Sequence, residues 1–281
     1  MIAVEDRLAI VEAVARALAE DIGTGDVTSL WVLPPELGAR GRFLVKEPGV
    51  IAGLEVGAEV FRQVDADVSW RTFIPDGSTV RPGDVVAEVV GRAQSLLSAE
   101  RVALNFLQRM SGIATLARRY VEAVRGTRAI ILDTRKTVPG LRVLDKLAVR
   151  LGGAANHRFG LFDMVLIKDN HIAAAGSITA AVERVRAHNQ ARLPVEVEVT
   201  NLDQLAEALS LGVDRILLDN MDLETMRRAV AYVDGRVELE ASGGITLENV
   251  AAVAATGVTH ISVGALTHSA RALDISLELE T

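Results

Sequence analysis

The chain has 281 residues, of which 49% are hydrophobic and 24% charged, and its formal net charge is −7. This composition is that of a globular protein of one or two domains, and the acidic balance argues against a nucleic-acid partner. The chain contains no cysteine, which excludes disulfides, thiolate metal ligands and cysteine nucleophiles and favours a reducing compartment.

The first 21 residues carry acids within an apolar pattern and lack the basic start and the small-residue cleavage site of a signal peptide. No apolar run approaches the roughly 18 residues that a membrane span needs. We therefore expect a cytoplasmic protein with no membrane contact.

The first hundred residues predict a mixed α+β unit. A helical pattern covers about 4–20, and β patterns fall within 41–53, 68–74 and 84–93, with a short helix before the second. Residues 95–126 are amphipathic, contain no proline and predict one long helix that links this unit to the next.

The rest of the chain alternates short apolar, β-branched runs with 10–15 residues of helical periodicity. The six runs are 129–133, 163–167, 195–199, 215–219, 237–241 and 260–264. Such alternation predicts a parallel sheet with helices outside it. If the sheet curves round on itself, it forms an α/β barrel with six β/α units in place of the eight of a (β/α)8 barrel. The alternative is an open, doubly wound sheet.

Polar residues follow each of these runs. In α/β folds the ligand binds beyond the carboxyl ends of the strands. The polar segments are Asp133 to Thr137, Lys168 to His171, Glu196 and Glu198, Asp219 with Asn220, Ser242 to Gly244, and Gly264 to Ser269.

A local positive charge stands out in the acidic chain. Residues 125–168 contain nine Lys and Arg against three acids, and three of the four lysines lie there: Lys136, Lys146 and Lys168. A basic pocket for a small polyanion has this composition, although a solvated helix face has it too.

Two glycine turns and two carboxylates are candidates for a sugar-phosphate site. The Ser242 to Gly244 turn and the Gly264–Ala265 turn offer backbone N–H groups to a phosphate. Glu198 and Asp219 can hold ribose hydroxyls or Mg²⁺, and Glu196 shares the face of Glu198 and is an alternative to it.

His157 precedes Arg158 in a loop that enters the second run of the sheet. It can donate a hydrogen bond to a carboxylate, or it can be a core or capping histidine. The five histidines form no His-x-x-x-His pair, so we expect no transition-metal site.

Several segments together resemble the quinolinate phosphoribosyltransferase family. They are ALNFLQRMSGIAT (103–115), DTRKTVPGLR (133–142), GGAANHRFGL (152–161), DMVLIKDNHI (163–172), VEVEV, ILLDN, ASGGI and SVGALTHSARALDISL, in order over most of the chain. The resemblance implies an N-terminal α+β domain, residues 1–105, an open six-stranded α/β barrel, residues 106–268, and a tail, residues 269–281, that returns to the first domain. It also implies a homodimer in which one subunit closes the barrel mouth of the other.

The resemblance also implies roles for particular residues. The two carboxylates of quinolinate would be held by Arg135, His157, Arg158 and Lys168, with Arg101 from the partner subunit. The DTRKT segment places Lys136, next to Thr137, at the pyrophosphate. Glu198 and Asp219 would hold the ribose and Mg²⁺, and the turns of Ser242, Gly243 and Gly244 and of Gly264 and Ala265 would hold the 5-phosphate. The implied activity converts quinolinate and phosphoribosyl pyrophosphate to nicotinate mononucleotide, carbon dioxide and pyrophosphate.

The residues leave other functions open. A paralogue could use the same barrel on another aromatic acid, as the relatives associated with molybdenum transport do. A Schiff-base aldolase could use Lys168, which ends a strand opposite a phosphate-like site. A non-catalytic binder of phosphorylated metabolites would leave the polar ends of all six runs unexplained. The chain departs from the family in having Arg271 where proline is common and Ala154 where glycine is frequent.

Overall fold

The computed structural model describes residues 4–281, so residues 1–3 of the predicted first domain lie outside the described residues. The chain divides into two compact units. The first contains residues up to 118, 137–153 and 267–281, and the second contains 119–136 and 154–266. In the described part of the chain, no helix is long and apolar enough to cross a membrane.

The first unit is built on a four-stranded antiparallel sheet with the strand order β12-β1-β5-β3. Its elements are α1 (Val4–Ile22), α2 (Val27–Val32), β1 (Gly38–Val45), β2 (Gly49–Val50), α3 (Leu54–Val64), β3 (Ser69–Thr72), β4 (Thr79–Val80), β5 (Val85–Arg92), α5 (Arg142–Leu151) and β12 (Ile275–Glu280). Helix α4 (Ala93–Ala123) begins in this unit and ends in the second.

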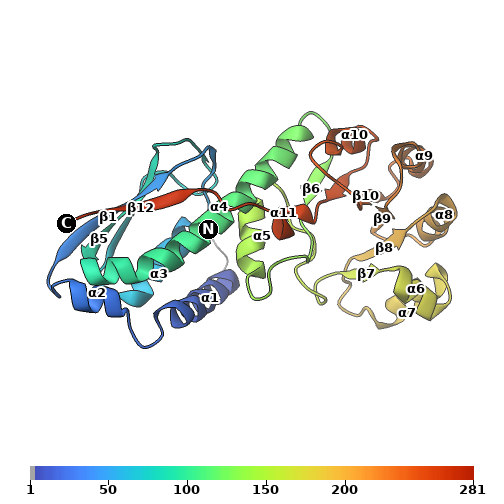
Figure 1. The fold of residues 1–281 in the computed structure, drawn as a ribbon. Helices are drawn as coiled ribbons and strands as arrows, with labels where there is room; N and C mark the ends of the chain where they lie inside the picture. The colour runs from blue at the N-terminus through green and yellow to red at the C-terminus, as the bar shows by residue number, and fades with distance from the viewer. Residues whose placement is uncertain (1–3) are drawn as a thin grey trace. The chain divides into compact units, whose positions relative to one another are not determined.

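The core of the first unit contains the fully buried rings of Phe43 and Phe61, which pack on Trp70 with centroid distances of 5.1 and 5.7 Å. Strand β12 pairs antiparallel with β1, so that Ile275 lies opposite Val45. The predicted return of the C-terminal tail to the first domain is therefore confirmed (Figure 1).

The second unit contains a six-stranded parallel sheet with the order β6-β11-β10-β9-β8-β7. Its elements are β6 (Ile130–Leu132), β7 (Val165–Ile167), α6 (Asp169–Ala175), α7 (Ile178–His188), β8 (Val195–Val199), α8 (Leu202–Ser210), β9 (Arg215–Asp219), α9 (Leu223–Val233), β10 (Glu238–Ser242), α10 (Val250–Ala254) and β11 (His260–Ser262). Helix α11 (Ala265–His268) begins in this unit and ends in the first.

This strand order decides between the two predicted architectures. The strands β7, β8, β9, β10 and β11 lie side by side in the order in which they occur along the chain, and β6 pairs with β11. Because right-handed crossovers in one direction place all helices on one face, the sheet is singly wound and not doubly wound. Strands β6 and β7 are its two edges, so the predicted open α/β barrel is confirmed, with α7 to α10 along its outer side (Figure 1).

Local capping explains where the outer helices begin. The side chains of Ser177, Asn201 and Asp222 accept hydrogen bonds from backbone N–H groups three residues later, at the starts of α7, α8 and α9. Helices that begin directly after short loops leave the carboxyl ends of the strands together at one edge of the sheet. That edge is where the predicted ligand residues lie.

Candidate active site

The strand register brings the predicted carboxylates to one side of neighbouring strands. Glu198 on β8 pairs with Leu217 on β9, and Asp219, two residues on, pairs with Ser242 on β10. Residues in register in a parallel sheet point to the same face, and alternate residues share it. Glu198, Asp219 and Ser242 therefore lie on the face opposite the helices, at the carboxyl ends.

Lys168 follows β7 and joins this group. Its Nζ lies 3.1 Å from Oε2 of Glu198, with 47% of the lysine side chain exposed and 11% of the glutamate. The backbone N–H of Lys168 donates to Nδ1 of His171 at 2.9 Å, which fixes the start of α6. An exposed ammonium beside a carboxylate can exchange that partner for an anionic ligand, because the pair is only weakly held in water.

Two guanidinium groups lie near one another at the same edge of the sheet. Burial and the nearby charge of Arg135 lower the pKa of Arg158, while the negative charges of Glu196 and Asp163 act in the opposite direction. Nη1 of Arg158 donates to the carbonyl of Met164 at 3.2 Å. Like charges placed together repel, so the arrangement is suited to an anion that lies between them.

Asp133, at the end of β6, anchors the loop that carries Arg158. It is fully buried and accepts hydrogen bonds from Nδ2 of Asn156 at 2.6 Å and from the backbone N–H of His157 at 2.9 Å. Ala155 also forms a parallel bridge to Leu132. The loop is thus tied to the sheet through both backbone and side chain.

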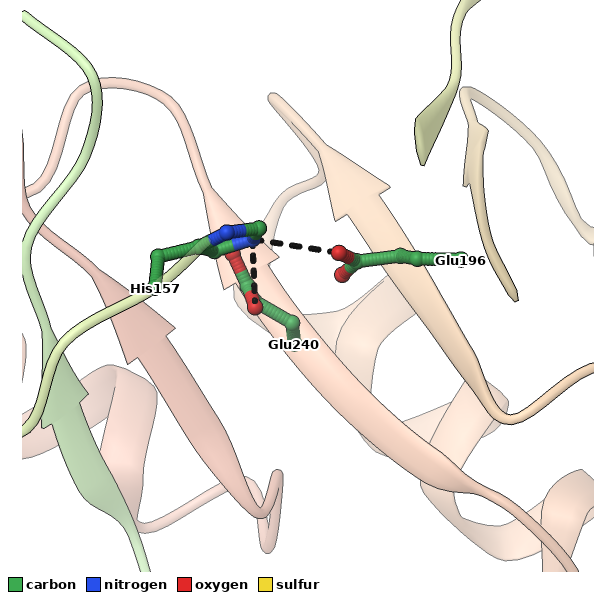
Figure 2. A group of neighbouring side chains, drawn as sticks. All are labelled: His157, Glu196 and Glu240. Carbon is green, nitrogen blue, oxygen red and sulfur yellow. Dashed lines mark ion pairs between the residues drawn. The ribbon is translucent and has the colours of Figure 1, made fainter. Parts of the chain in front are cut away.

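His157, in this loop, forms a buried cluster with Glu196 on β8 and Glu240 on β10. Nε2 of His157 lies 3.1 Å from Oε2 of Glu196 and 3.5 Å from Oε2 of Glu240, and both acids are fully buried (Figure 2). Nη1 of Arg215 lies 3.1 Å from Oε2 of Glu240. Burial raises the pKa of both carboxyl groups well above the usual range, and for Glu240 the charge of Glu196 adds to the effect.

Sequence reasoning missed Glu240 and Arg215. The sequence did carry a signal for Glu240. The otherwise apolar strands VEVEV and VELEA each contain two glutamates two residues apart, and this spacing places both glutamates of a strand on the same face. The structure separates the predicted pair, because Glu196 is fully buried whereas Glu198 is partly exposed. Of the two acids, only Glu198 has a side chain that reaches the surface.

The turn after β10 contains two glycines with positive φ. Gly243 and Gly244 have φ of +92° and +62°, a region that only glycine adopts readily. A Cβ on Gly243 would overlap the side chain of Asn220, whose backbone N–H donates to the carbonyl of Ser242 at 2.9 Å. The turn is therefore held close to the end of β9. Gly264 and Ala265 follow β11, which is the next strand of the sheet.

Three further predicted residues are divided between the two units. Lys136 is exposed in the second unit, and Thr137 begins a segment of the first, where its Oγ1 accepts from Nε of Arg142 at 3.1 Å. Arg101 is exposed on α4 in the first unit.

The fold and this site define a class of protein: an open α/β barrel with a basic, carboxylate-lined ligand site at the carboxyl ends of its strands. The family models of the quinolinate phosphoribosyl transferase C-terminal domain and N-terminal domain match residues 113–278 and 26–111. The chain belongs to this family, and the prediction of an enzyme of this family from the sequence is confirmed.

Individual relatives agree with the family match. A nicotinate-nucleotide pyrophosphorylase (carboxylating) from Oryza sativa subsp. japonica is 46% identical over 284 residues, covering 94% of this chain and 76% of the relative. A probable enzyme of the same name from Bacillus subtilis is 45% identical over 260 residues, covering 92% and 90%. The solved structure of NadC from Streptococcus pyogenes is 42% identical, with a TM-score of 0.93 over 96% of this chain and 95% of that one.

Proposed function

We propose that this chain transfers the phosphoribosyl group of phosphoribosyl pyrophosphate to quinolinate and releases pyrophosphate and carbon dioxide. The observation that carries the proposal is that Arg135 and Lys168 closely follow strands β6 and β7, and that the loop of Arg158 is bridged at Ala155 to Leu132 at the end of β6, so all three basic residues belong to the carboxyl ends of the sheet. Quinolinate brings two carboxylates, and guanidinium groups match carboxylates with paired hydrogen bonds. Family membership supports the same assignment.

The proposed reaction needs positioning more than acid–base chemistry. The pyridine nitrogen attacks the anomeric carbon while the bond to pyrophosphate breaks. The ring nitrogen is then cationic and stabilises the electron pair left on the adjacent ring carbon when its carboxylate departs as carbon dioxide, and that pair then binds a proton. Arg135, Arg158 and Lys168, here called the basic cup, hold the carboxylates, with His157 in the same loop, so the nitrogen faces the sugar.

The donor's anionic groups are assigned to the remaining predicted residues. Exposed Lys136 meets the pyrophosphate, and its charge stabilises the leaving group. The turns of Ser242 to Gly244 and of Gly264 and Ala265 hold the 5-phosphate by backbone N–H groups. Glu198 and Asp219 accept from the ribose hydroxyls and stabilise positive charge at the anomeric carbon.

The same two carboxylates fit Mg²⁺, which is a hard cation that prefers oxygen ligands and keeps several waters. Glu198 and Asp219 lie on neighbouring strands and on one face, and neither is fully buried. When bound, Mg²⁺ would neutralise charge on the pyrophosphate.

We further propose a cytoplasmic homodimer with shared active sites. The support is the exposed position of Arg101 on α4 and the absence of cysteine from the chain. The partner subunit's Arg101 would then complete the carboxylate site.

The exposure of Lys168 argues against the alternative of a Schiff-base aldolase. Lys168 is half exposed and paired with Glu198, unlike the desolvated lysine that a Schiff-base aldolase uses.

The test is to mix the purified protein with quinolinate, phosphoribosyl pyrophosphate and Mg²⁺ and to follow nicotinate mononucleotide, with nicotinic acid as the control substrate. Product from quinolinate alone is expected. Failure to form product from quinolinate by a folded protein would contradict the proposal, and product from another aromatic acid in its place would point to the paralogous activity. Borohydride trapping with a keto substrate tests the aldolase.

A further inference from the structure

Both ring nitrogens of His157 contact other groups of the protein. Its side chain is 7% exposed. Nδ1 accepts the backbone N–H of Arg158 at 2.7 Å, and Nε2 faces Glu196 and Glu240 at 3.1 and 3.5 Å (Figure 2). A ring nitrogen that accepts from a backbone N–H has its proton on the other nitrogen. The arrangement therefore corresponds to an Nε2–H tautomer pointing at the two acids.

The two acids come from strands on either side of β9. Glu196 lies on β8 and Glu240 on β10, so the two acids approach the histidine ring from the strands on either side of β9. Among the described residues, neither carboxylate oxygen of Glu196 has a hydrogen-bond partner, and Oε1 of Glu240 has none. Buried carboxylates are costly unless nearby charges compensate them, and Nε2 of His157 shares that compensation with Arg215, which lowers the pKa of both acids.

Other charged groups surround the cluster. Arg215 on β9 contacts both Glu240 and the exposed Glu238, at 3.1 Å each. His260 lies 3.8 Å from Glu238, and Arg158 is near enough to Glu196 for their charges to interact. Arg215, whose side chain is 20% exposed, and Arg158 supply part of the compensating charge, which disfavours a divalent cation between the three side chains that could coordinate one.

We propose that Glu196 and Glu240 are positioning residues that hold the ring of His157 from inside the sheet. Through it they fix the segment Asn156 to Arg158, so that Arg158 meets a quinolinate carboxylate. The inference rests on the proposed function. Asp133 holds the same segment from the β6 side, through the side chain of Asn156 and the backbone N–H of His157, and the histidine ring holds it from the β8 and β10 side. A loop fixed at two points presents its arginine in one orientation, which carboxylate recognition requires.

The test compares substitutions on one strand. Glu240→Met removes one of the two acids that face Nε2 of His157, leaves Glu196 in place and keeps the length of the side chain, whereas Glu240→Gln keeps an acceptor at that position. Glu238→Met is the matched control, because Glu238 shares the strand, the face and the contact with Arg215 but is 54% exposed and is not a partner of His157. The proteins are compared as the full chain with quinolinate and phosphoribosyl pyrophosphate varied separately.

Glu240→Met is expected to raise KM for quinolinate on the order of tenfold, with KM for phosphoribosyl pyrophosphate changed less than about twofold. Glu240→Gln should recover much of the loss, and Glu238→Met should stay near wild type. In ¹⁵N-histidine spectra, the Nε2 signal of His157, assigned through His157→Gln, should move in Glu240→Met and not in Glu238→Met.

Equal loss of both KM values, or an unmoved His157 signal, would overturn the inference. So would a stoichiometric metal ion that is lost in Glu240→Met. Failure of the proposed function is separable from these outcomes, because Arg158→Ala would then leave quinolinate binding unchanged. If Arg158→Ala abolishes quinolinate binding while His157→Gln does not, only the positioning inference fails.

Discussion

The ammonium of Lys168 lies 3.1 Å from Oε2 of Glu198 and joins the carboxyl ends of the neighbouring strands β7 and β8. The lysine belongs to the basic cup and the glutamate to the proposed ribose and Mg²⁺ site. A ligand that binds both halves must therefore compete with, or replace, this ion pair.

Lys168→Ala is expected to lower kcat/KM for quinolinate by about 100-fold, because a charge-assisted contact to a substrate carboxylate is lost. The thermal midpoint should change little, because an exposed ion pair contributes at most about 1 kcal/mol. Steady-state kinetics with each substrate varied in turn, together with thermal unfolding, checks both. An unchanged KM for quinolinate would remove Lys168 from the basic cup.

Gly243→Ala is expected to raise KM for phosphoribosyl pyrophosphate on the order of tenfold, with a smaller effect on quinolinate. A side chain there overlaps Asn220 and opposes a φ of +92°. Gly235→Ala is the control, because Gly235 has φ of +71° but no atom within 4 Å of its added Cβ. Both substitutions cost about 1 kcal/mol of backbone strain, so similar kinetic constants in the two variants would argue against a phosphate site at this turn.

Gly112→Ala is expected to destabilise the protein by about 3 kcal/mol. The added Cβ would overlap the carbonyl oxygen of Arg271, at the point where the C-terminal tail crosses α4. Arg271 also pairs with Glu47, and the backbone N–H of Asp274 donates to the same carboxylate at 2.8 Å. Urea unfolding measures the change. Gly38→Ala, whose Cβ meets nothing within 4 Å, should be close to wild type, and equal stability of the two variants would contradict the close approach.

Asp76→Asn tests a pH dependence of the stability. Both carboxylate oxygens of Asp76 accept from the N–H of Leu54, at 3.1 and 3.2 Å, and burial raises the pKa of Asp76 to about 6, with the charge of Glu55 adding to the effect. The native state then holds the proton more tightly than the unfolded state. The free energy of unfolding contributed by this group is thus fully present below pH 3.8 and falls as the pH rises towards 6.

Relative to wild type, Asp76→Asn should therefore gain stability between about pH 4 and 6, by about 1 to 2 kcal/mol after allowance for partial exposure. Asp26→Asn is the control of opposite sign, since hydrogen bonds from Ser29 lower the pKa of Asp26. The loss of stability it causes should be present above pH 4 and should vanish as the carboxyl group of the wild type is protonated below. Urea titrations at several pH values give both slopes, and parallel slopes would refute the assignment.

Mixing inactive variants tests the shared active site. In a dimer of Arg101→Ala with Lys168→Ala, one site carries both changes and the other carries neither. If subunits exchange at random, about a quarter of the wild-type activity should return on mixing. No recovery after verified exchange would mean that Arg101 serves its own subunit or no site at all.

Much of the fold was predictable because its signals are local. The apolar runs that form β6 to β11 are followed by small or polar residues. The segments between them have helical periodicity and are longer than a typical strand. Pattern alone could not choose between singly and doubly wound sheets, because that choice depends on which strands pair. The pairing of β6 with β11 is a contact between residues that are about 130 positions apart in the chain.

By itself, the sequence determined the strand ends that carry polar groups, the basic character of the segment around Arg135 and Lys168, and the motifs of the family. Only the tertiary structure decided that Glu196 is buried beneath His157 while Glu198 meets Lys168, and that Glu240 and Arg215 complete the cluster. The physical reason is that alternation along a strand sets which face a side chain occupies. Its depth and partners depend on neighbouring strands and on a loop brought to them by folding.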